Sequence, residues 1–191
     1  MTLKSWGTFC RAHGRYGDVL CSSSDRARLN RFRARYVFAR RLTGISATGY
    51  SEHAQRGYCA GLRVQLAANA AEVIGHVVGE DFKRWNLDEP DLAGALRNNL
   101  KTVSDASDTL FDREELRELL RDFIAGRNDV RVAATAVRIL FAHGTFTPSV
   151  TKAMTRRGAE AFHRLADVVL DGSEQRFVNW FGERMQRVEA A

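Results

Sequence analysis

Residues 130–144 read Val-Arg-Val-Ala-Ala-Thr-Ala-Val-Arg-Ile-Leu-Phe-Ala-His-Gly, and this stretch predicts an amphipathic helix. Apolar side chains recur along it every three or four residues, which is the spacing of the buried face of an α-helix. We expect Asn128 to cap the first turn and Gly144 to end the last one. The same period dominates the rest of the chain, and strand patterns are almost absent. The sequence therefore predicts an all-α fold.

Start and stop signals divide the chain into about seven helices joined by short links. The expected starts after the first helix are Ser51, Pro90, Asp112 with Glu115 as a capping pair, Asn128, Thr147-Pro148 and Ser173, and the expected stops are Gly79, Gly126 and Gly144. The first helix spans 25–43 and is rich in arginine. We expect one helical bundle over 25–191, preceded by a loosely ordered arm at 1–24, which is rich in glycine and serine.

The composition is compatible with one sizeable core and indicates a polyanionic partner. The chain has 191 residues, 45% of them hydrophobic, with a net charge of +6 and a pI near 9.6. Residues 1–66 hold 12 basic and 3 acidic side chains, whereas residues 67–191 hold 17 and 20. A basic first third on a mildly acidic body favours a polyanionic partner, with RNA or DNA ahead of a membrane surface. On the first helix Arg31, Arg35 and Arg40 are the candidate RNA contacts; the alternative is a solvated basic face.

The cysteines and the hydropathy indicate a reduced, cytoplasmic location without a membrane partner. Cys10, Cys21 and Cys59 are an odd number in a chain that lacks a secretory signal pattern. No apolar run approaches the roughly 18 residues that span a bilayer. Cys10, Cys21 and His13 match no common zinc-site spacing. We expect neither a metal nor a cofactor, because no phosphate-binding glycine loop or zinc-protease motif is present either.

The end of the helix at 130–144 carries two groups that can act on a phosphate. The Arg138 guanidinium can bind phosphate oxygens in a bidentate manner, and the His143 imidazole can take or give a proton. Arg131 lies seven residues before Arg138 and shares its face, and Arg127 would extend that stripe as an RNA contact. Arg138 and His143 diverge by about 140° on one regular helix, so a broken helix end or a second copy is needed to bring them together.

Structural roles are the alternative for these residues. His143 would then bond to a carbonyl at the helix end, and Arg138 would form an ion pair. The candidate acidic partners of Arg138 are Asp129, Glu114 and Glu118. His76 lies one turn from Glu72 on the long second helix and could assist the site, but a surface or core histidine is the commoner role.

The segment from Val130 to Gly144, with Arg138 and His143 near its end, resembles the signature of HEPN domains. These are all-α ribonucleases and nucleotide-binding modules marked by an arginine, four to six variable residues and a histidine. The resemblance implies a homodimer whose two motif helices face each other across a cleft. It also implies metal-independent RNA cleavage that leaves a 2′,3′-cyclic phosphate, with His143 as acid or base and Arg138 stabilising the phosphorane. An endoribonuclease of stress response, toxin–antitoxin or antiviral defence is the leading hypothesis, with an antitoxin or defence protein as a further partner.

The residue after the arginine departs from this pattern. Active members usually carry a polar residue there, and this chain has Ile139. A catalytically silent HEPN-like module that binds nucleic acid or protein is therefore the second hypothesis. The third is a helical DNA-binding regulator, although residues 25–50 lack a clear helix-turn-helix.

Overall fold

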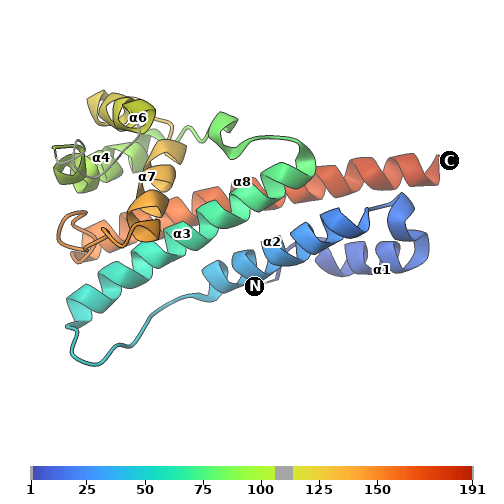
Figure 1. Cartoon of the computed structure of the whole chain (residues 1–191), viewed down its shortest axis with the longest axis horizontal. Helices are drawn as coiled ribbons and strands as arrows, with labels where there is room; N and C mark the ends of the chain where they lie inside the picture. The colour runs from blue at the N-terminus through green and yellow to red at the C-terminus, as the bar shows by residue number, and fades with distance from the viewer. Residues whose placement is uncertain (1, 106–113, 191) are drawn as a thin grey trace.

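The computed structural model describes residues 2–105 and 114–190, and these residues form seven α-helices with two short 3₁₀ helices (Figure 1). The predicted all-α bundle of about seven helices is confirmed. The α-helices are α1 (Trp6–Tyr16), α2 (Ser23–Arg41), α3 (Glu52–Val78), α4 (Pro90–Asp105), α6 (Glu114–Ala125), α7 (Arg131–Ala142) and α8 (Arg156–Glu189), and the 3₁₀ helices are η1 (Gly17–Val19) and η2 (Phe82–Arg84).

Two long helices, α3 and α8, run side by side in the same direction and form the long axis of the molecule (Figure 1). Alanine-rich faces let them pack closely, since Ala60, Ala67 and Ala71 of α3 and Ala166 of α8 are fully buried. α2 packs on both helices and runs in the opposite direction (Figure 1). α4, α6 and α7 form a second group, on the other side of α3 from α2 (Figure 1).

Local signals in the sequence predicted the second helix well. α3 begins after Ser51, whose hydroxyl accepts the Ala54 N–H at 3.2 Å. It ends at Gly79, which adopts the left-handed conformation with φ of 77°. These are the N-cap and C-cap roles that serine and glycine favour. The start of α4 at Pro90 also agrees with the sequence, whereas the predicted capping residue Asp112 lies outside the described residues.

The N-terminal segment differs from the expected loose arm. α1 is a helix whose Phe9 is 2% exposed and packs against Phe177 and Phe181 of α8, with ring centroids 5.9 and 5.7 Å apart. Leu20, after η1, is also buried. The glycines and serines of this segment predicted a loose arm, because the α8 side chains that pack against it lie more than 150 residues away in the chain.

The segment after α7 also differs from the sequence expectation. Turns follow Pro148, and one uninterrupted helix, α8, then begins after Thr155, which caps it by accepting the Gly158 N–H at 3.0 Å. Ser173, expected to cap a separate last helix, lies buried inside α8 and donates its hydroxyl hydrogen bond to the Val169 carbonyl at 2.7 Å. A serine that bonds to the carbonyl four residues back is compatible with a continuing helix.

The start of α7 is fixed by a link to the segment before α4, and Asn128 does not cap it. Val130 N–H donates to the Leu87 carbonyl at 3.0 Å, and Asp88 pairs with Asp129 in an isolated β-bridge. The Asp129 carboxylate accepts the Arg131 N–H at 3.0 Å. The N-cap position is Val130, which has no side-chain cap, and the first helical N–H is bonded by Asp129 rather than by Asn128.

Candidate functional site

Two glycines of α3 let the chain around the end of α7 approach the α3 backbone. A methyl group on Gly61 would overlap the Phe141 ring and lie 2.5 Å from Cζ of Phe146. A methyl group on Gly57 would likewise overlap Pro148. The rings of Phe141 and Phe146 lie 4.4 Å apart and rest on this part of α3. The C-terminal end of α7, which carries the arginine–histidine motif, is thus held against α3.

Arg138 forms an ion pair with Glu72 of α3. Its Nη2 lies 3.0 Å from Oε1 of Glu72, and its Nη1 donates to Oε2 at 3.3 Å. Such a bidentate ion pair fixes the plane of the guanidinium as well as its position. The Arg138 side chain keeps 26% of its surface exposed. The partner comes from a distant helix rather than from the acidic residues near Arg138 that the sequence had offered.

His143 lies at the surface, where α7 ends. It is exposed, and its backbone N–H donates to the Ile139 carbonyl at 3.0 Å. Gly144 follows with φ of 66°, so the chain turns away directly after the histidine. No hydrogen bond or ion pair joins Arg138 to His143 among the described residues, in keeping with their expected divergence. Ile139 is half-buried against the core.

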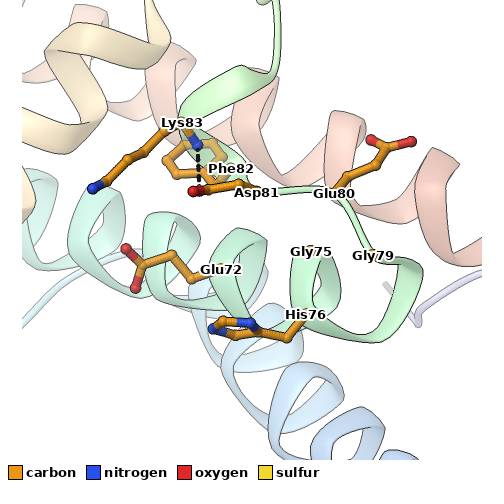
Figure 2. A pocket seen from close by; sticks show the side chains of 8 residues that line it. All are labelled: Glu72, Gly75, His76, Gly79, Glu80, Asp81, Phe82 and Lys83. Carbon is orange, nitrogen blue, oxygen red and sulfur yellow. Dashed lines mark hydrogen bonds between the residues drawn. The ribbon is translucent and has the colours of Figure 1, made fainter.

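A hollow of about 540 Å³ lies beside the Arg138–Glu72 pair. It is lined by Glu72, Gly75, His76, Gly79, Glu80, Asp81, Phe82 and Lys83. Figure 2 shows Glu72 and His76 on neighbouring turns of α3, with the segment from Asp81 to Lys83 across from them. Lys83 N–H donates to the Asp81 carboxylate at 2.9 Å, which fixes that rim. His76 is thus exposed on the same wall of this hollow as Glu72.

The other two arginines of the expected stripe lie elsewhere. Arg131 is buried, and its Nε donates to Oδ2 of Asp129 at 3.1 Å, so its charge is used inside the protein. Arg127 precedes α7 instead of extending it, and its Nη2 donates to Asp122 at 2.8 Å. The structure therefore does not bring Arg127 or Arg131 together with Arg138 into one exposed stripe.

The arginines of α2 divide into two kinds. Arg31 is exposed and Arg35 is partly exposed, and neither has an ion pair among the described residues. Arg40 points inward with 9% of its side chain exposed and forms ion pairs with Asp167 (2.8 Å) and Asp171 of α8. Because α3 lies between α2 and α7, the basic face of α2 and the motif belong to different sides of α3 (Figure 1).

A polar network joins α2, α3 and α8, and the sequence did not predict it. Arg63 of α3 shares Asp167 with Arg40, at 2.6 Å, and Tyr36 donates its hydroxyl to Glu174 at 3.0 Å. Burial raises the pKa of Tyr36 to about 12. The four-residue spacing of Asp167 and Asp171 was the available signal, since it places two carboxylates on one face of a helix.

His163 of α8 touches the same network. Its Nδ1 lies 3.4 Å from Nη1 of Arg63. Burial, and then the positive charge of Arg63, hold the pKa of His163 below its ordinary value, while Asp167 acts in the opposite direction. This histidine is therefore favoured in its neutral form.

Comparisons with known proteins identify no relative: no family model, curated protein or solved structure matches the chain. Among the described residues, no helix is both long and apolar enough to cross a membrane. In the same part of the chain, no group of three histidine, cysteine or acidic side chains is arranged to hold a metal ion. The cysteines are free thiols, and burial raises the pKa of Cys21 to about 11.

Proposed function

We propose that the chain is a metal-independent endoribonuclease of HEPN type in which Arg138 and His143 act on the phosphodiester. The observation that carries the proposal is the bidentate ion pair between Glu72 of α3 and a partly exposed Arg138. Arg138 lies on α7, the helix that ends at an exposed His143. A cation of fixed orientation and a titratable imidazole at one helix end are the two groups that this cleavage requires.

Glu72 supplies what Ile139 lacks. In the HEPN pattern a polar residue after the arginine accompanies activity, and here that position faces the core. The Glu72 carboxylate from α3 contacts both terminal nitrogens of Arg138 and can orient the guanidinium instead. Glu72 is thus a positioning residue, which acts through Arg138 rather than on the substrate.

The chemistry is an internal displacement at phosphorus. The ribose 2′-oxygen forms a bond to the phosphorus and gives its proton to a base, while the bond to the 5′-oxygen breaks and that oxygen receives a proton. The products are a 2′,3′-cyclic phosphate and a 5′-hydroxyl. His143 is the group that transfers a proton, and Arg138 stabilises the added negative charge on the phosphorane. Because the two side chains diverge on α7, the proposal includes a homodimer in which a second copy completes the site.

The second candidate is a silent module that binds nucleic acid or protein without cleaving it. The specific observation in its favour is that Glu72 occupies both terminal nitrogens of Arg138, as in an ordinary structural ion pair.

Cleavage of a labelled single-stranded RNA in EDTA separates the two candidates. We expect the wild type to leave 2′,3′-cyclic phosphate ends, and His143→Ala and Arg138→Ala each to lower the rate by about 10²–10⁴-fold. Arg187→Ala is the matched control, since it replaces an exposed arginine near the end of α8, away from α7. Cleavage that persists in both motif variants, or that needs a divalent metal, would contradict the mechanism. An inactive, correctly folded wild type would favour the silent module.

A further inference from the structure

A second hollow, of about 380 Å³, opens beside Phe141 of α7 and has a mainly aromatic and aliphatic lining. Its wall includes Ile45, Tyr50, Gln55, Tyr58, Leu62 and Phe141. We call it the aromatic hollow. Phe141 stands between Arg138 and His143 in the sequence, so the aromatic hollow adjoins the motif helix. Leu62 and Glu72 are ten residues apart on α3, which places the Arg138–Glu72 pair about 15 Å farther along the helix.

Four aromatic rings form a row from solvent into the core at this hollow. Tyr50 is 56% exposed, and its ring centroid lies 5.9 Å from that of Tyr58 in an edge-to-face arrangement. Tyr58 lies 6.1 Å from Phe146, which in turn contacts Phe141. An exposed tyrosine held in such a row offers a ring on which a flat ligand can stack.

The loop that carries Tyr50 is held in place by Gln55. The Gln55 side-chain amide donates to the Tyr50 carbonyl at 2.8 Å and to the Ala47 carbonyl at 3.3 Å. These bonds join the loop before α3 to the first turns of α3 itself. The wall of the aromatic hollow is therefore fixed by these hydrogen bonds, which lowers the entropy lost on binding.

The aromatic hollow continues into a polar surface that carries Arg56. Ile45 and Gln55 also line a neighbouring hollow, whose wall includes Arg56. The nearest polar partner of Arg56 is His53 Nδ1 at 3.4 Å, and no carboxylate pairs with Arg56 among the described residues. The N-terminal ends of α3 and α8 meet at this end of the molecule (Figure 1), and their dipoles add positive potential. Glu52 also lines this hollow and offsets part of the charge.

We propose that the aromatic hollow is a base-binding subsite for single-stranded RNA, in which an unpaired base stacks on Tyr50 and Tyr58 and Arg56 binds a backbone phosphate. Aromatic rings next to a basic groove are the usual means of binding single strands, because every base has a face that can stack. A paired base cannot enter, since its faces are covered by its neighbours in the duplex. The inference rests on the proposed function for the choice of RNA as the polymer.

The test uses the wild-type protein and a 2′-O-methyl RNA 12-mer that carries one 2-aminopurine, a base whose fluorescence falls when it stacks. The 2′-O-methyl groups prevent attack by the 2′-oxygen, so binding is measured without cleavage. We expect quenching on binding by the wild type and by Tyr50→Phe, which keeps the ring. Tyr50→Leu should lose the quenching and weaken affinity about 5- to 150-fold, the range for one base–aromatic stack.

Two controls locate the effect. Tyr16→Leu changes a tyrosine of α1, at the opposite end of the bundle (Figure 1), and should leave the affinity unchanged. Arg56→Gln should make the slope of log affinity against log salt shallower by about 0.7, as expected for one lost phosphate contact to a single strand. Arg187→Gln, at the exposed end of α8, should leave that slope unchanged.

Three results would overturn the subsite. These are no binding of the single strand, equal affinity for the strand and its duplex, or a Tyr50→Leu variant that binds and quenches as the wild type does. The cleavage assay tests the proposed endoribonuclease independently of this subsite. A wild type that binds and quenches but does not cleave would keep the subsite and remove the endoribonuclease, whereas cleavage without quenching would do the reverse.

Discussion

Replacing Gly61 with alanine tests whether the approach of α7 to α3 depends on a missing side chain. In the middle of a helix, glycine to alanine by itself stabilises by up to about 1 kcal/mol. At Gly61 the added methyl group would overlap the Phe141 ring and crowd Phe146. Both rings pack against the core, so they must shift, and overpacking of this kind costs about 1–3 kcal/mol. The two effects oppose each other and must be separated.

Gly182→Ala provides the separation. Gly182 lies in α8, is exposed, and has no atom within 4 Å of an added methyl group. This variant should show the helix-propensity gain alone, and the free energies of unfolding of the two variants should differ by about 1–3 kcal/mol, with Gly61→Ala the less stable. Urea unfolding followed by far-ultraviolet circular dichroism measures the difference, provided that the two m-values agree. A Gly61→Ala variant stabilised as much as Gly182→Ala would refute the packing of α7 described above.

Two further predictions concern charge. Changing Arg31 and Arg35 to glutamine should weaken RNA binding by the same factor for all sequences, and should make the slope of log affinity against log salt shallower by about 0.7 per lost phosphate contact. Arg40→Gln should instead lower the melting temperature, because Arg40 forms its ion pairs inside the protein. Unchanged affinity in the double variant would make this face an ordinary solvated surface. The pKa of His163 is lowered from 6.5, so protonation of this side chain favours the unfolded chain. The contribution of neutral His163 to the free energy of unfolding is fully present above pH 6.5 and is lost as the pH falls toward the lowered pKa. His163→Gln should flatten the dependence of unfolding free energy on pH between 7 and 5, and an unchanged slope would contradict the role of burial.

The sequence by itself determined the fold class and several helix boundaries. Helical periodicity, the serine at 51 and the glycine at 79 are local features, and a helix forms from bonds between residues four apart, so these signals needed no knowledge of the rest of the chain. The motif helix was found for the same reason, including its end at Gly144. In each of these features, the stabilising interactions are made between residues that are close together in the sequence.

Only the tertiary structure decided which side chains meet. Arg138 pairs with Glu72, 66 residues away, and Arg40 reaches residues of α8 while Arg31 faces solvent. Phe9 orders a segment that looked loose because its aromatic partners lie at the other end of the chain. A sequence pattern shows which face of a helix is apolar, but not which distant helix covers it. Burial and the pairing of buried charges depend on that choice, and they distinguish the arginines that form ion pairs inside the protein from those that face solvent.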